Sequence, residues 1–224
     1  MKALASITNE AQLAALIHEI GFLPMFSSCI PGFSLEDCTP QSHWFVEGVV
    51  GAWEWRESVL DGTIAYGKFF DKKAGFVDKA WLGDFCNHRR DGYDFEGFFE
   101  DGFASYKSKA IVETLQRQGP MLSRLLKEAC GYREGGEKGF DGVITQLQMQ
   151  SFVTIEAFEY TRDRFGRPYG WGLSRYALME QAFSEEAVNA ADSRSPAESR
   201  ARMKAQILSL FPAASEKQLD RLLH

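Results

Sequence analysis

The spacing of the apolar residues changes within residues 140–177, from helical spacing to a pattern that favours strands. Apolar residues recur at helical spacing over residues 140–147, with polar residues on the other face. Residues 152–160, FVTIEAFEY, are instead rich in the β-branched and aromatic side chains that favour strands. The turn-forming stretch 162–168 separates this run from a second one at 169–177. The sequence therefore predicts a helix that is followed directly by a β-hairpin.

Two further helices are predicted immediately before this segment. Residues 105–118 carry an apolar face and end at Gly119, and Pro120 then opens a second helix that continues to Gly131. Three helices followed by a hairpin is the order of a winged helix, in which the third helix and the hairpin, or wing, can both face DNA. The sequence thus predicts an α+β fold with a winged-helix domain at residues 104–183.

The flanking regions are predicted to add structure on both sides. Residues 1–103 form an N-terminal α/β region that includes a helix capped by Asn9 and a strand near residues 63–70. Proline and glycine interrupt residues 22–40, which are expected to be irregular. Residues 184–224 are expected to form a polar linker and a C-terminal helical tail.

The charge balance limits the classes of function. The 224 residues include 25 Lys and Arg against 31 Asp and Glu, which gives a formal net charge of −6. This excludes a uniformly basic protein that coats nucleic acid and leaves room only for a local basic patch. No stretch approaches the roughly 18–20 apolar residues of a membrane helix, and the first residues lack the features of a signal peptide. We therefore expect a cytoplasmic protein with no membrane partner.

The cysteines are scattered and form no CxxC pair; they are Cys29, Cys38, Cys86 and Cys130. Reduced structural thiols are the expectation for such a pattern. Zinc binding that includes His43 is an alternative, but the spacing matches no usual zinc finger. Motifs for binding nucleotides or dinucleotides and for esterase or zincin chemistry are absent from the sequence. We therefore predict no metal and no cofactor.

The turn of the predicted hairpin is basic inside an acidic chain. The charged residues of segment 161–176 are Arg162, Arg164, Arg167 and Arg175 against Asp163 alone, a local charge of +3. Such a turn can contact phosphates or the minor groove and so add salt-dependent affinity for DNA. The alternative is a hairpin that is charged for solubility and edge protection.

Other residues are candidates for the same surface. The basic candidates outside the hairpin are Lys138, just before the third helix, and Lys72 and Lys73 in a second basic segment. The aromatic candidates are Tyr66, Tyr169 and Trp171, which can stack on bases or line a space for one. Packing in the core is the alternative for the aromatic side chains.

Three glutamines lie at the end of the third predicted helix: Gln146, Gln148 and Gln150. A glutamine amide can hydrogen-bond adenine, or position a water molecule, while remaining neutral. Residues 146 and 150 are one helical turn apart, whereas residue 148 points about 200° away from either. In a regular helix the three therefore cannot all serve one site, and glutamines on a solvated helix face are the alternative.

Several stretches of the chain resemble bacterial proteins grouped as AlkZ-related. They are WEWR at 53–56, AYGKFF at 65–70, RRDGYD at 89–94, GFDGVITQLQMQ at 139–150 and FGRPYGWG at 165–172. The resemblance implies a winged-helix architecture and a distant kinship with the AlkZ and YcaQ DNA glycosylases, which remove alkylated or crosslinked bases. Those enzymes carry a glutamine–apolar–glutamine (or aspartate) motif, which residues 146–148 and 148–150 both match. The resemblance thus implies Gln146, Gln148 and Gln150 as catalytic candidates.

The chemistry of such a site is coherent. An N7-alkylated purine is already a cationic leaving group, so its release needs no strong general acid, and a neutral amide that holds a water molecule suffices. The sequence therefore predicts a protein that binds double-stranded DNA. It leaves open excision of alkylated bases, DNA binding without catalysis as a regulator or repair accessory module, and a protein-interaction domain.

Overall fold

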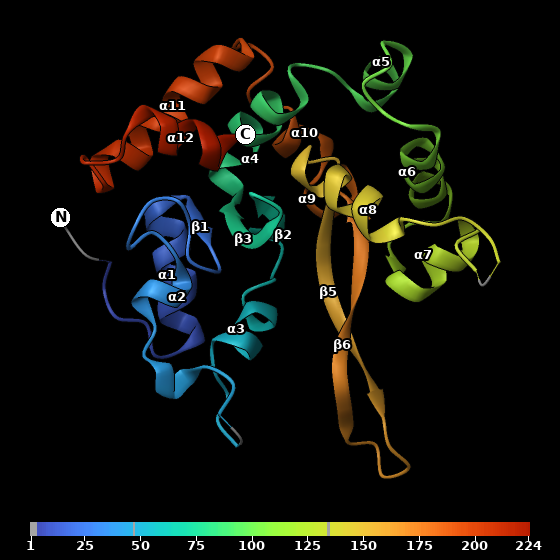
Figure 1. Ribbon diagram of the computed structural model, residues 1–224, viewed down its shortest axis with the longest axis horizontal. Helices are drawn as coiled ribbons and strands as arrows, with labels where there is room; N and C mark the ends of the chain where they lie inside the picture. Colours follow the sequence, from blue (N-terminus) through green and yellow to red (C-terminus); the bar gives the residue numbers. More distant parts are fainter. Residues whose placement is uncertain (1–3, 47, 134) are drawn as a thin grey trace.

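The computed structural model describes residues 4–46, 48–133 and 135–224, without the side chains of residues 168, 169 and 171. The fold is mixed α+β, as predicted, and contains two separate antiparallel sheets of three strands each. One sheet belongs to the N-terminal region, and the other contains the long hairpin that projects from the body (Figure 1).

The N-terminal sheet has the strand order β1-β3-β2. The elements of this region are α1 (Glu10–Ile20), β1 (Phe22–Pro24), α2 (Leu35–Cys38), the 3-10 helix η1 (Gln41–His43), α3 (Ala52–Ser58), β2 (Ile64–Phe70) and β3 (Lys73–Asp78). The structure corrects the prediction that residues 22–40 are irregular, because they contain β1 and α2. Strand β1 exists through its pairing with β3, in which Phe22 lies opposite Val77, and a local sequence pattern does not reveal such a partner.

The second sheet has the order β4-β6-β5, and helices pack around it. Its region contains α6 (Tyr106–Gln118), β4 (Met121–Leu122), α7 (Ser123–Ala129), α8 (Phe140–Met149), β5 (Val153–Arg162) and β6 (Pro168–Leu178). This order of three helices and a hairpin is compatible with the predicted winged helix. One boundary was wrong: Pro120 does not open a helix, because the next two residues form β4 opposite Tyr176 and Arg175. Helix α7 therefore starts at Ser123.

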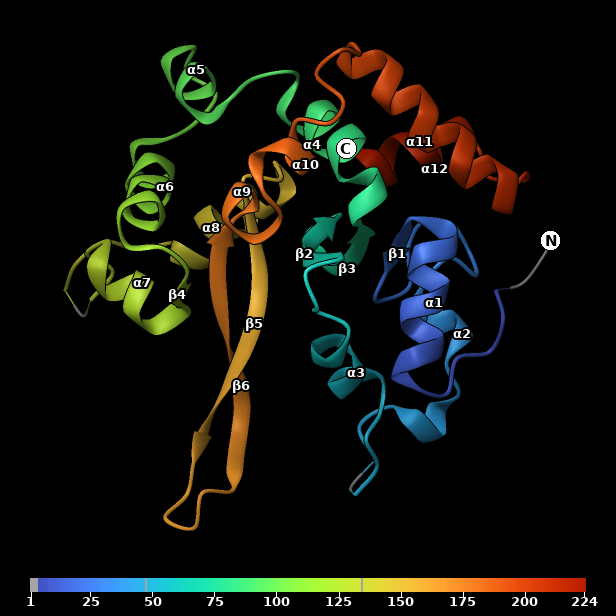
Figure 2. The same cartoon turned by 180° about the vertical axis from the view of Figure 1, so that it is seen from behind.

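The hairpin of β5 and β6 contacts the N-terminal region along β5, from Thr154 at its root to Tyr160. Thr154 Oγ1 donates a hydrogen bond to the backbone oxygen of Tyr66 in β2, at 2.9 Å. Further along β5, Phe158 lies under the guanidinium of Arg56 at 4.3 Å, and Tyr160 donates a hydrogen bond to Glu57 in α3. Figures 1 and 2 show that the far end of the hairpin stands clear of the body on the side opposite the C-terminal helices.

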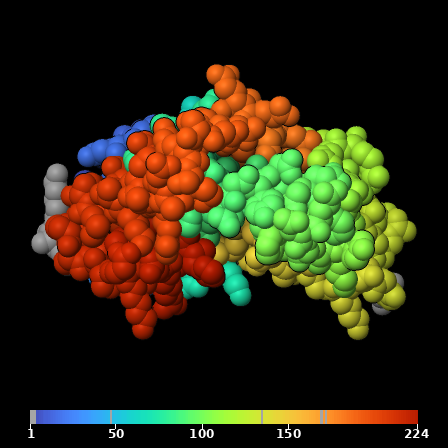
Figure 3. Space-filling model, turned by 90° about the horizontal axis from the view of Figure 1, so that it is seen from above, coloured from blue at the N-terminus to red at the C-terminus, as the bar shows by residue number. Residues whose placement is uncertain are grey.

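Helix α4 (Lys79–Arg90) organises the other end of the molecule. Around it lie α5 (Phe95–Glu100), α9 (Met179–Phe183), α10 (Glu185–Val188), α11 (Pro196–Leu210) and α12 (Glu216–Leu223). The buried carboxylate of Asp84 in α4 accepts hydrogen bonds from Ser199 Oγ at 2.8 Å and Arg194 Nη1 at 2.9 Å. Figure 3 shows this end, with the C-terminal helices in red and orange on one side and the green segment of α5 on the other.

The segment predicted as a polar linker, residues 184–195, is packed rather than free. It contains α10, and Val188 and Ala191 are buried. Asn87 in α4 donates hydrogen bonds from its side chain to the backbone oxygens of Ala191 and Arg194. The segment is therefore fixed by contacts with α4, which a count of its polar residues does not indicate. None of the helices in the described ranges is long and apolar enough to cross a membrane.

The contact between α4 and α12 predicts an acid-sensitive stability. His88 is partly buried, its Nε2 donates to the backbone oxygen of Leu223 at 2.9 Å, and burial lowers its pKa to about 4. An unfolded chain has a histidine pKa of about 6.5, so between these values the unfolded state binds more protons than the folded one. The free energy of unfolding should therefore fall as the pH decreases from about 6.5 to 4.

Urea unfolding at several pH values, compared with the variant His88→Gln, measures this effect. The difference in slope between the two proteins isolates His88 from the carboxylates, which titrate in both. Identical pH slopes for the wild type and the variant would contradict the assignment.

Candidate nucleic-acid interface

The turn at the end of the hairpin is built around one carboxylate. Asp163 Oδ1 accepts hydrogen bonds from the backbone nitrogens of Phe165 at 2.8 Å and Arg167 at 2.9 Å. Its Oδ2 accepts one from Arg167 Nε at 3.0 Å. The backbone hydrogen bond from Arg167 is the largest cause that lowers the pKa of Asp163. The single acid of the turn thus fixes its backbone and neutralises one arginine.

Two of the predicted arginines stay free of carboxylates. Arg162, Arg164 and Arg167 are all exposed. Arg162 Nη1 donates to the backbone oxygen of Gly166 at 2.8 Å, and neither Arg162 nor Arg164 forms an ion pair with another described residue. Three arginines against Asp163 leave a local charge of +2 at the turn. The structure therefore places Arg162, Arg164 and Arg167 together at the projecting end of the molecule.

Arg175, the fourth arginine of the hairpin, has a different place. It forms an ion pair with Glu159 on β5, and its Nη1 donates to the backbone oxygen of Pro120 at 3.1 Å. Arg175 therefore ties β6 to β5 and to the start of β4. The charge of Arg175 is neutralised by Glu159 on the neighbouring strand.

The side chains of Gln146, Gln148 and Gln150 differ in burial, as expected from their positions around the helix. Gln146 is exposed and Gln150 is half-buried, whereas Gln148 is completely buried. The Gln148 Nε2 donates to the backbone oxygen of Ile144 at 3.0 Å, and its Oε1 accepts from the backbone nitrogen of Lys68 in β2 at 3.0 Å. Both ends of the amide are thus engaged in joining α8 to the N-terminal sheet.

A glycine makes this close approach of α8 and β2 possible. A Cβ atom on Gly67 would lie 3.1 Å from Gln148 Oε1 and 2.7 Å from the ring of Phe69. Tyr66, the preceding residue, is in the core, and its hydroxyl donates to Met25 Sδ at 3.4 Å. Tyr66 therefore does not line a surface for DNA. The other two aromatic candidates, Tyr169 and Trp171, have side chains that lie outside the described part of the structure.

The predicted lysines divide between two places. Lys72 is exposed at the end of α8, where its backbone nitrogen donates to Met149 Sδ at 3.3 Å, and Lys138 is exposed just before α8 begins. The side chain of Lys73, at the start of β3, stays within the N-terminal region, where its Nζ donates to the backbone oxygen of Ser27 at 3.0 Å. Two of the three lysines therefore flank α8, one at each end.

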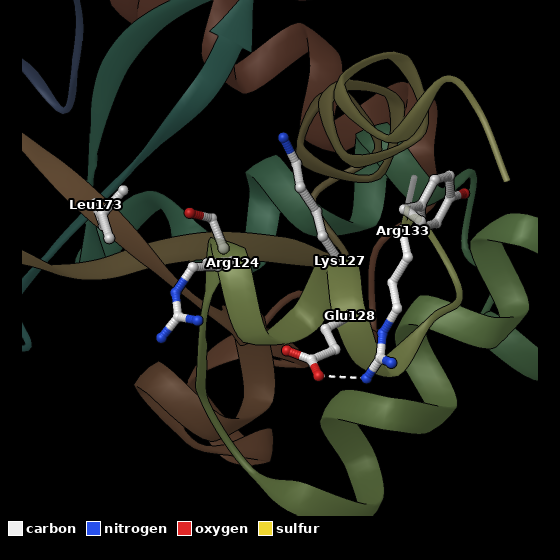
Figure 4. A pocket seen from close by; sticks show the side chains of 7 residues that line it. Arg124, Lys127, Glu128, Arg133 and Leu173 are labelled. Atoms are coloured by element: carbon white, nitrogen blue, oxygen red, sulfur yellow. Dashed lines mark hydrogen bonds and ion pairs between the residues drawn. The ribbon is translucent and has the colours of Figure 1, made fainter. Parts of the chain in front are cut away.

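A cavity of about 570 Å³ opens beside the hairpin (Figure 4). It is lined by α7, the following loop and β6, through Ser123, Arg124, Lys127, Glu128, Tyr132, Arg133 and Leu173. Glu128 binds Arg133, and Lys127 forms an ion pair with Asp141 at 3.1 Å. Arg124 forms no ion pair with any residue that the structure describes.

The basic residues that line this cavity, Arg124, Lys127 and Arg133, are not among the candidates predicted from the sequence. Their only signal in the sequence is the spacing of Arg124 and Lys127, three residues apart and therefore neighbours on a helix surface. Such spacing is common on solvated helices. The cavity becomes visible only when α7 packs next to the hairpin.

A larger cleft of about 1010 Å³ lies at the other end of the molecule, between α4, α5, α6 and α9. Six of its lining residues are acidic, namely Asp94, Glu96, Glu113, Glu180, Glu185 and Asp192, and three are basic, namely Arg90, Lys109 and Arg194. Phosphate groups are disfavoured beside such an excess of carboxylates. The cleft therefore carries an excess of negative charge, whereas the hairpin turn carries a local positive charge.

The cysteines and histidines do not assemble a metal site in the described ranges. No group of three or more His, Cys, Asp or Glu side chains there is placed to hold a metal ion. The four cysteines are free thiols, and burial raises the pKa of Cys38 to about 11. These thiols therefore act as small packing groups.

The position of Gln148 predicts a structural cost for its removal. Gln148→Ala removes a fully buried amide and leaves the backbone nitrogen of Lys68 without its acceptor, and each of the two hydrogen bonds lost contributes about 0.5–1.5 kcal/mol. Gln146→Ala, on the exposed face of the same helix, is the matched control and should change the free energy of unfolding by less than about 0.5 kcal/mol. Denaturant unfolding of both variants measures the difference. Equal stabilities would show that the amide does not join the two elements.

Comparison with known proteins adds one finding to this geometry. The family described as AlkZ related matches residues 7–224, a range that includes every helix and strand of the structure. No curated protein and no solved structure matches the chain. The match extends the resemblance noted in the sequence through the C-terminal helices. The chain therefore belongs to the AlkZ-related family.

Proposed function

We propose that this protein binds double-stranded DNA through the end of the hairpin and the exposed face of α8. The observation that carries the proposal is the hairpin turn, where Arg162, Arg164 and Arg167 project together from an otherwise acidic molecule. Cations that project in this way contact phosphates and release counterions. Family membership supports the same direction, since it relates the chain to the AlkZ-type DNA glycosylases.

Helix α8 has dimensions and charges that suit a groove. A helix such as α8 (Phe140–Met149) has a diameter of about 10–12 Å with its side chains, which the major groove of about 12 Å admits. Lys138 and Lys72 flank its two ends, and the neutral amide of Gln146 is exposed between them. In this arrangement the lysines contact phosphates on either side of the groove, and Gln146 reaches a base edge.

Excision of an alkylated base is the second candidate function, and the family relationship favours it. Gln148 belongs to both matches of the glutamine motif, but its amide already bonds two backbone groups. If the chain is catalytic, the water-positioning amide is therefore that of Gln146 or Gln150. DNA binding without catalysis needs no such group, and for this reason it is our first proposal.

The charge of the hairpin turn predicts salt-dependent DNA binding. Arg164→Glu combined with Arg167→Glu should weaken binding to any duplex sequence, because the wild-type side chains act on phosphates. The slope of log K against log salt should become shallower by about 0.9 for each phosphate contact that is lost. A gel-shift or anisotropy titration between 50 and 200 mM salt, the range in which the effect is large, measures both quantities.

A charge-matched control separates this contact from net charge. Lys79→Glu combined with Lys217→Glu changes the total charge equally at two exposed lysines outside the hairpin, and should leave affinity close to that of the wild type. If both double variants lose the same affinity, the hairpin is not the contact. If the wild type binds no duplex at low salt, the DNA proposal is wrong and a protein partner becomes the first candidate.

Base release tests the second candidate. The assay follows free base from a duplex that contains N7-methylguanine, with enzyme in excess over DNA. A catalytic chain should release base at a rate that Gln146→Ala or Gln150→Ala reduces strongly without loss of DNA binding, since a water-positioning amide acts mainly in the transition state. A wild type that binds this duplex and releases no base would leave only the binding function for that lesion.

A further inference from the structure

One residue of the hairpin turn, Phe165, is aromatic and exposed. Phe165 is 67% exposed and lies between two arginines of the turn. The guanidinium carbons of Arg164 and Arg167 lie 4.7 and 5.2 Å from the centre of its ring. No other ring of the described residues contacts it. Phe165 therefore does not pack in the core, and its apolar surface faces solvent.

The backbone holds this ring in a defined position. The amide nitrogen of Phe165 itself donates to Asp163 Oδ1 at 2.8 Å, and Arg167 binds the same carboxylate through its backbone nitrogen and Nε. The strands that lead to the turn contain 10 and 11 residues and pair as far as Arg162 and Pro168. The hairpin turn thus presents one exposed aromatic ring with two guanidiniums close to it.

We propose that Phe165 inserts between adjacent base pairs of the bound duplex from the minor groove and kinks the DNA. This inference rests on the proposed DNA binding of the same hairpin. The minor groove is about 6 Å wide and admits side chains rather than a two-stranded ribbon, so the residues at the turn enter it first. Apolar side chains such as Phe unstack a base step there, and arginines are favoured in the same groove.

The insertion also sets a preference among duplexes. Unstacking is least costly at flexible pyrimidine–purine steps and at mismatched or damaged positions. The cation–π contacts of Arg164 and Arg167 with the ring are exchanged for contacts of the guanidiniums with DNA acceptors and of the ring with bases. The preferred ligand is therefore a duplex with a weakly stacked step, such as TA or a single mismatch.

The test follows the DNA as well as the protein. The probe is a duplex of about 25 base pairs with donor and acceptor dyes at its ends and 2-aminopurine beside a central mismatch, a length over which bending is readily resolved. Wild-type protein should raise the 2-aminopurine fluorescence and shorten the end-to-end distance by a bend of roughly 20–90°. Phe165→Ala should abolish both signals and weaken binding roughly 5- to 150-fold.

Two further variants control this result. Phe165→Leu keeps an apolar side chain and should retain part of the bend. Phe103→Ala removes a 58% exposed phenylalanine that follows α5 and should change nothing in DNA binding. Because Phe165 is exposed, the melting temperature of Phe165→Ala should equal that of the wild type, which excludes unfolding as the cause.

The possible failures are distinguishable. Wild-type protein that binds the duplex without bending it or unstacking the probe would overturn the insertion and leave the DNA-binding proposal intact. Equal bending by Phe165→Ala would overturn it in the same way. Wild-type protein that binds no duplex at all would overturn both proposals together.

Discussion

The buried amide of Gln148 is the contact on which the arrangement of the two halves depends. It bonds one backbone group of its own helix and one of β2, so α8 and the N-terminal sheet are held together by a neutral polar group that is fully satisfied. A Cβ atom on Gly67 would clash with the ring of Phe69 at 2.7 Å and would lie only 3.1 Å from Gln148 Oε1. Such an amide is directional, and replacing it leaves the backbone nitrogen of Lys68 without its acceptor. The contact therefore fixes which face of α8 remains exposed, and this face carries Gln146.

A second contact holds the hairpin to the N-terminal region, namely that of the buried Arg56 side chain with aromatic rings. Arg56 is almost completely buried, with its guanidinium between the rings of Trp53 and Phe158 at 3.7 and 4.3 Å. Because β5 stays paired with β6 from this cluster to the turn, with a register shift between Glu159 and Thr161, the fixed contact with α3 limits the directions in which the arginines project. The N-terminal region thus acts as a support for the hairpin. A hairpin without such a support would present its turn in many orientations, at an entropic cost on binding DNA.

The sequence predicted the elements whose stability is local and missed those that depend on distant partners. Helix α8 and the hairpin follow from apolar periodicity, and Ser195 correctly marked the start of α11. Strands β1 and β4 contain only three and two residues, and each exists because β3 or β6 lies beside it. The same limit applies to the candidate site. The exposed arginines are visible in the sequence, whereas the burial of Gln148 is not, since a glutamine on a helix is usually solvated.

The separation of charge in the molecule explains how an acidic chain can present a basic contact. The carboxylates of the large cleft and the arginines of the turn lie at opposite ends, and the hairpin separates them. The 11 residues of β6 alone span about 35 Å at roughly 3.3 Å per residue. The Debye length at physiological salt is about 8 Å, so charges at that distance are screened from one another. A phosphate at the turn therefore experiences the local charge of +2 rather than the net charge of −6. In the DNA complex that we propose, the acidic end disfavours direct approach by phosphates, and the hairpin turn is therefore the end that meets the duplex first.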